Sequence, residues 1–157
     1  RAIVGQQVST QAATTIFNRL VELVQTEFTP DGLLARPEED LRSVGLSRQK
    51  VMYVRALSAA WLEEPERFGR LAALSDEEAC AALTSIKGIG IWTAQMFLMF
   101  TLQRPDVFAP GDLGLKKAMA NLLGLAMESP ERAFALRAQR WSPHRSWASL
   151  HLWQSLA

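Results

Sequence analysis

Apolar residues recur every three or four positions along this chain, and no run of strand length alternates apolar with polar residues. That spacing places apolar side chains along one face of an α-helix, so the sequence predicts an all-α fold. Proline and glycine mark the breaks between the helical segments. We expect helices near residues 2–25, 38–43, 47–63, 76–84, 91–102, 112–123, 130–139 and 143–156.

The length of the chain bounds its organisation. With 157 residues and 48% hydrophobic content, it can bury one good core, so we expect a single unit over residues 1–157 with room for two helical lobes. The chain opens with Arg1 in a pattern that is already amphipathic, with neither Met nor an N-cap residue ahead of it. We therefore expect a further N-terminal segment upstream.

Composition excludes several classes of protein. A net charge of +1 is low for a protein that binds nucleic acid by charge alone, so any basic surface must be local. The single cysteine, Cys80, excludes an internal disulfide and a four-cysteine iron–sulfur cluster. His144 and His151 lack the spacing of a zinc site. No apolar run approaches the roughly 18 to 20 residues that cross a bilayer, and no signal peptide leads the chain. We expect a monomer of the cytoplasm or nucleoid, without contact with a membrane.

A glycine turn separates two helix-like runs near the middle of the chain. Gly88 and Gly90 permit positive φ and leave their amides uncovered, and the following helix adds free N–H groups and a partial positive charge. A phosphate can bind such a turn without any side chain reading the base sequence. Short glycine motifs are common, however, and Gly-Ile-Gly taken alone more often only links two helices.

The chain as a whole resembles the HhH-GPD superfamily of DNA base-excision glycosylases, and within it the AlkA-type 3-methyladenine DNA glycosylases. The resemblance rests on four segments that run nearly end to end, which are Arg1-Ala-Ile-Val-Gly-Gln-Gln-Val-Ser9, Gly88-Ile-Gly-Ile-Trp-Thr-Ala94, Asp106-Val-Phe-Ala-Pro-Gly-Asp112 and Trp141-Ser-Pro-His-Arg-Ser-Trp-Ala-Ser-Leu-His-Leu-Trp153. It implies a two-lobed helical fold with a cleft between the lobes, a helix-hairpin-helix at about 76–102 and a Gly/Pro-Asp loop at 104–112. The implied partner is double-stranded DNA that contains damaged bases.

Asp112 is the residue that the resemblance implies to be catalytic. Base removal breaks a C1′–N bond through a cation-like sugar, which a carboxylate can stabilise while it orients or deprotonates water. Taken alone, Asp112 after Pro110-Gly111 is equally an N-cap of the next helix, and both roles can hold together. Asp106 matches no catalytic position and is expected to be a loop residue. Arg145 matches a family arginine that either supports the pocket or lies at the surface.

The resemblance also implies a base pocket formed by Trp92, Trp153, Met96 and Leu113. Bifunctional members carry a lysine at the position of Trp92, and an indole cannot form their Schiff base, so a monofunctional enzyme is implied. An aromatic face suits an electron-poor alkylated purine. Met96 and Leu113 depart from some relatives, so a glycosylase for oxidised or deaminated purines stays open, as does a non-catalytic helix-hairpin-helix module. The other tryptophans, Trp61, Trp141 and Trp147, are expected in packing.

The resemblance implies DNA contacts in two segments of the chain, one at Gln7 and the other from Lys87 to Thr93. Gln7 matches the wedge that fills the space of a flipped base, while hydrogen bonding to neighbouring helices is open for Gln7 and favoured for Gln6. The expected backbone contacts are Lys87, Gly88, Ile89, Gly90 and Thr93. The main-chain carbonyls of Thr84, Ile86 and Ile89 match positions that hold a sodium or potassium ion in the superfamily. No other cofactor is expected.

Overall fold

The computed structural model describes residues 1–25 and 28–156, and over these residues the regular structure is helical, without strands. The all-α prediction is confirmed. The chain divides into two compact units, which are unit 1, Arg1–Thr93, and unit 2, Ala94–Ala157. Helix α8, Ile91–Phe100, begins in the first unit and continues into the second. Among the described helices, none combines the length and the hydropathy that a membrane span requires.

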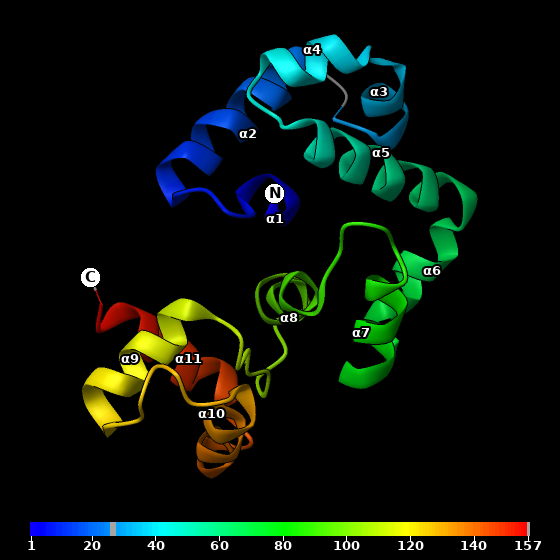
Figure 1. The fold of residues 1–157 in the computed structure, drawn as a ribbon. Coiled ribbons are helices and arrows are strands. Elements are labelled where there is room, and N and C mark those ends of the chain that lie inside the picture. Colours follow the sequence, from blue (N-terminus) through cyan, green and yellow to red (C-terminus); the bar gives the residue numbers. More distant parts are fainter. Residues whose placement is uncertain (26–27, 157) are drawn as a thin grey trace. The chain divides into compact units, whose positions relative to one another are not determined.

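Unit 1 is built around its longest helix, α5 (Figure 1). Helices α1, α3, α4 and α6 each contact α5, and α2 packs against α1 and α4. Its buried apolar side chains include Leu20, Leu41, Val51 and Leu71. The elements are α1 (Ala2–Gly5), α2 (Thr10–Val24), α3 (Pro30–Ala35), α4 (Glu38–Ser43), α5 (Arg48–Glu63), α6 (Pro65–Arg70), the 3-10 helix η1 (Leu71–Ala73) and α7 (Asp76–Thr84).

Serine side chains start the main helices of unit 1. Ser9 accepts a hydrogen bond from the Ala12 N–H at the start of α2, and Ser47 does the same for Lys50 at the start of α5. Ser75 forms a capping box with Glu78 at the start of α7. Each cap satisfies an amide that has no partner within the helix, which fixes where the helix begins.

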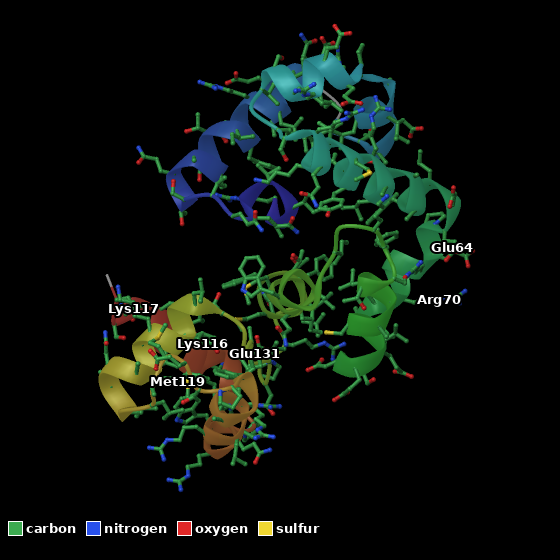
Figure 2. The ribbon with its side chains drawn as sticks, in the orientation of Figure 1. Glu64, Arg70, Lys116, Lys117, Met119 and Glu131 are labelled. Carbon is green, nitrogen blue, oxygen red and sulfur yellow. The ribbon has the colours of Figure 1, made fainter. Side chains whose placement is uncertain are left out.

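Unit 2 combines the rest of α8 with α9 (Leu113–Leu123), α10 (Glu131–Ala138), the 3-10 helix η2 (Gln139–Trp141) and α11 (Arg145–Gln154). Helix α9 packs against α11 around fully buried Leu115, Met119 and Phe134. Lys116 on α9 pairs with Glu131 of α10 at 4.0 Å, and its ammonium lies 5.5 Å from the ring centroid of Phe134. Figure 2 labels Lys116 and Glu131. Gly124, with φ 70°, ends α9 in the left-handed conformation that favours glycine.

The observed helices differ from the expected ones in several places. Residues 2–25 form two helices, because Gln7 adopts φ 55° and Ser9 caps a new start. The sequence did not predict helices α3 and α6, because prolines such as Pro30 and Pro65 also mark breaks between helices. Each proline lies instead in the first turn of a helix, where its missing N–H removes no hydrogen bond within the helix. Helix 91–102 ends at Phe100, and α11 begins at Arg145 instead of residue 143.

Two tryptophans expected in packing keep substantial solvent exposure. Trp61 is 45% exposed at the end of α5 and stacks on Phe68, with ring centroids 4.4 Å apart. Trp147 is 61% exposed on α11. Both lie on helix faces that no described neighbour of their unit covers fully. Trp141 is half-buried and contacts Phe108, in agreement with its expected role.

Candidate functional site

The hairpin, residues 85–90, joins α7 to α8 and is anchored by its two isoleucines. Ile86 and Ile89 are buried, while Lys87 and Gly90 are exposed. The Ile89 N–H donates to the Ile86 carbonyl at 3.0 Å, which closes the turn. The hairpin therefore buries its apolar side chains and leaves Lys87 and Gly90 in contact with solvent.

Gly88 is required at its position for two independent reasons. Its φ of 91° lies in the region that favours glycine. A Cβ at this position would lie 2.1 Å from Cγ of Tyr53, which packs directly on the hairpin from α5. The close approach of Tyr53 therefore depends on the absence of a side chain at Gly88.

Two long side chains from elsewhere in unit 1 hold the hairpin. The Gln6 side-chain amide donates to the Gly88 carbonyl at 3.0 Å and to the Thr93 hydroxyl at 3.2 Å. Arg67 of α6 donates to the Ala82 carbonyl and to the Ser85 hydroxyl, at the end of α7. The expected hydrogen bonding of Gln6 to a neighbouring helix is confirmed. No motif in the sequence marks Arg67, because its partners lie far along the chain.

Asp112 lies at the N-cap of α9 in unit 2, where two N–H groups fix its carboxylate. Its Oδ1 accepts from the Leu115 backbone N–H at 2.8 Å and from the Trp153 indole Nε1–H at 2.9 Å. The N-cap prediction is confirmed. Two donors to one oxygen orient the carboxylate.

Gly114 lets the Trp153 ring reach Asp112. A Cβ at Gly114 would lie 2.9 Å from Trp153 Cδ1, 3.0 Å from its Nε1 and 3.1 Å from Asp112 Oδ1. The indole also stacks on Phe100, with ring centroids 6.0 Å apart and an angle of 26° between the planes. Sequence reasoning did not single out Gly114 or Phe100, because neither stands in a recognisable motif.

The loop that leads to Asp112 is anchored on the first turn of α11 through Asp106. The Asp106 carboxylate accepts from Arg145 Nε at 2.7 Å, Nη2 at 3.0 Å and the backbone N–H at 3.0 Å, and from the Ser142 hydroxyl at 2.7 Å. These bonds, from Arg145 first, lower the pKa of Asp106 to about 2. Asp106 lies in a loop as expected, and Arg145 supports that loop.

Ser146 adds a buried link between the same loop and α11. Its hydroxyl donates to the Arg104 carbonyl at 2.6 Å and accepts from the Val107 N–H at 2.9 Å. The N-terminal end of helix α11 therefore holds the Gly/Pro loop. Near its C-terminal end, α11 supplies Trp153, which donates a hydrogen bond to Asp112.

The other predicted site residues differ in burial. Trp92 is half-buried in unit 1, and Thr93 is buried beside it. Met96 is buried in unit 2, whereas Leu113 is 73% exposed next to Asp112. Gln7 is exposed. Because Gln6 precedes Gln7 and donates to the Gly88 carbonyl, it links Gln7 to the hairpin, where the other residues expected to contact DNA lie. The structure joins Asp112 to Trp153 by a hydrogen bond in unit 2.

Ile86 and Ile89 of the hairpin offer oxygen ligands only from their backbone. The Ile86 carbonyl accepts one hydrogen bond, from Ile89, and a carbonyl oxygen has a second lone pair. Across residues 1–25 and 28–156, no three His, Cys, Asp or Glu side chains are grouped as metal ligands. Carbonyl oxygens at Thr84, Ile86 and Ile89 fit a hard monovalent cation better than a transition metal.

Comparison with known proteins gives consistent matches. The sequence model of the HhH-GPD superfamily base excision DNA repair proteins matches residues 1–143. DNA-3-methyladenine glycosylase 1 of Schizosaccharomyces pombe is 33% identical over 99% of this chain and 69% of its own length. DNA-3-methyladenine glycosylase of Saccharomyces cerevisiae is 35% identical over 88% of this chain and 49% of its own length. The chain thus spans about half to two thirds of these curated relatives.

A solved structure agrees with the sequence matches. The 3-methyladenine DNA glycosylase of S. pombe in complex with abasic DNA superposes with a TM-score of 0.90 at 30% identity. The superposition covers 98% of this chain and 76% of the solved one. The expected helical glycosylase fold is confirmed, and this chain belongs to the HhH-GPD superfamily of base excision DNA repair proteins.

Proposed function

We propose that this chain is the catalytic part of a monofunctional DNA glycosylase, which removes alkylated purines such as 3-methyladenine and 7-methylguanine and leaves an abasic site. The observation that carries the proposal is the Asp112 carboxylate, fixed at the N-cap of α9 by Leu115 and Trp153. The names of its relatives, DNA-3-methyladenine glycosylases, support the same reaction.

The proposed chemistry needs one carboxylate and one water molecule. As the C1′–N bond of the damaged nucleotide breaks, its electron pair leaves with the base and the sugar becomes cation-like. The ionised Asp112 stabilises this charge, in the way that carboxylates stabilise the transition states of glycoside hydrolysis. Asp112 then takes a proton from the water that adds to C1′. The reaction consumes no cofactor.

Aromatic side chains would select the damaged base. An alkylated purine is electron-poor or cationic, so it gains from stacking on the face of an indole. The N–H of Trp153 already donates to Asp112 and its indole stacks on Phe100, so the ring face opposite Phe100 is the part that would contact the base. Met96 and Leu113, which belong to the same unit as Trp153, would also line the proposed pocket. Trp92 has no amine for a Schiff base, which makes strand cleavage by that route unavailable.

The hairpin would hold the DNA backbone. Backbone amides of Gly88 and Gly90, the exposed Lys87 and the adjoining Thr93 form the proposed contacts, and Gln7 would enter the base stack as the wedge. Ile89, the remaining residue expected to contact DNA, instead donates its N–H to the Ile86 carbonyl and so shapes the turn. Carbonyls of Thr84, Ile86 and Ile89 would hold a sodium or potassium ion, which offsets phosphate charge. Binding should depend on salt and little on base sequence. We place the activity in the cytoplasm or nucleoid, with the protein acting as a monomer on double-stranded DNA.

The test is base release from defined substrates. The wild-type chain is incubated with methylated duplex DNA and with duplexes that contain hypoxanthine or 8-oxoguanine, and the released bases are identified by chromatography. We expect release of 3-methyladenine and 7-methylguanine, with strand breaks that appear only after alkali. Breaks without alkali would contradict a monofunctional enzyme. Release of only hypoxanthine or 8-oxoguanine would assign another lesion, and binding without any release would indicate a non-catalytic module.

A further inference from the structure

We infer that Gln6 is a positioning residue that couples the wedge, Gln7, to the phosphate-binding hairpin, so that one binding event places both on the DNA. The inference rests on the proposed function, since it takes the wedge and hairpin roles from there. It adds a residue to which that proposal gives no part.

The side chain of Gln6 bonds two residues of the hairpin region, and each of them lies more than 80 residues from Gln6 in the sequence. Its one NH₂ group donates to the Gly88 carbonyl at 3.0 Å and to the Thr93 hydroxyl at 3.2 Å. A primary amide carries two hydrogens, so both bonds form at once. Gln6 therefore fixes the hairpin at its glycine and at the first turn of α8 together.

Gln7 is held in a conformation that few residues adopt. Its φ of 55° lies in the left-handed region, which is uncommon for a residue other than glycine. Such a conformation persists only where the flanking residues are fixed. On one side Gln6 is tied to the hairpin, and on the other Ser9 caps α2 through the Ala12 N–H. The exposed Gln7 side chain is thus aimed by its neighbours.

The segment before Gln6 is fixed as well. Lys50 of α5 donates its ammonium to the Val4 carbonyl at 2.7 Å, at the end of α1. Tyr53, one turn further along α5, packs on Gly88. Helix α5 therefore supports α1 and the hairpin, and Gln6 closes the link between them. A hairpin bound to phosphate then sets the position at which Gln7 enters the base stack.

The test separates base flipping from binding and from chemistry. Gln6→Met keeps the length of the side chain and removes both donors. Flipping is followed by the fluorescence of 2-aminopurine placed beside 7-methylguanine, binding to undamaged duplex by anisotropy, and base release under single-turnover conditions. We expect Gln6→Met to slow flipping on the order of tenfold, because small displacements of positioned groups have effects of that size or larger. Affinity for undamaged duplex should stay within about twofold of wild type, since the hairpin amides remain.

A double-mutant cycle with Gln7→Ala shows whether Gln6 acts through the wedge. If it does, Gln6→Met should slow flipping little further in the Gln7→Ala background. If the two residues act independently, the effects of the two substitutions on the flipping rate should multiply. Multiplying effects, or a Gln6→Met protein that flips at the wild-type rate, would overturn the inference. If Gln6→Met does not fold, Gln6→Asn replaces it, because its amide is too short to reach both acceptors. A wild-type chain that releases no base refutes the proposed function instead, so the two failures are distinguishable.

Discussion

Replacing Asp106 with asparagine should destabilise unit 2 by a predictable amount. The substitution keeps the shape of the side chain and removes the charge that faces Arg145 at 2.7 and 3.0 Å. The pKa of Asp106 falls from its ordinary value of 3.8 to about 2 in the folded chain, first because of the hydrogen bonds from Arg145. A difference of that size corresponds to at most about 2 kcal/mol of folding free energy at neutral pH.

Solvent reduces this figure, because the Arg145 and Asp106 side chains are 33% and 24% exposed. We therefore expect Asp106→Asn to lower the free energy of unfolding by about 1 kcal/mol, with a fall in melting temperature of about 3 °C for a chain of this length. Urea denaturation followed by circular dichroism measures the change. Glu131→Gln is the matched control in the same unit, since its ion pair with Lys116 is 4.0 Å long and 62% exposed at Glu131.

The pH dependence gives a sharper test of the same pair. The folded-state pKa of Asp106 is depressed, so its stabilisation is complete above about pH 4 and is lost as the pH falls toward 2. The stability difference between wild type and Asp106→Asn should therefore stay constant from neutral pH to about pH 5 and shrink below about pH 4. A difference no larger than that of Glu131→Gln, or one that grows as the pH falls, would refute the reasoning.

Two substitutions beside Asp112 should affect turnover more than folding. Trp153→Phe removes the N–H that donates to Asp112 at 2.9 Å. Because a hydrogen bond to a charged group contributes about 1.5 to 3 kcal/mol, single-turnover base release should slow by roughly tenfold to a hundredfold. An unchanged rate would show that this bond does not position the carboxylate. Gly114→Ala adds a Cβ 2.9 Å from Trp153 Cδ1 and should slow release in the same assay, while a rate equal to wild type would mean that the indole shifts without consequence.

Local sequence signals predicted the parts of the fold that depend on neighbouring residues. The Pro110-Gly111-Asp112 sequence marked a helix start, and Asp112 caps α9 as that pattern indicates. Pro30 and Pro65 were interpreted as breaks, although a proline also suits the first turn of a helix, so sequence alone did not separate the two uses. The break at Gln7 depends on a backbone angle that the residue type disfavours.

Contacts between distant residues could not be predicted in the same way. Trp153 is 41 positions from Asp112, and Gln6 is 82 positions from Gly88. Each pair meets only because the helices pack, and packing depends on the whole core. The resemblance singled out Asp112, Trp153 and Gly88 separately, whereas the structure supplied the hydrogen bonds that join them to other residues.

The most direct test of the central claim compares base release by wild type and Asp112→Asn. Asparagine is also a good N-cap, and its carbonyl can accept the bonds from Leu115 and Trp153, so the fold should stay intact while the charge is lost. We predict that the variant binds duplex containing 7-methylguanine as wild type does. Its rate of base release should be lower by about a hundredfold or more. Release by Asp112→Asn at the wild-type rate would contradict the catalytic role of Asp112.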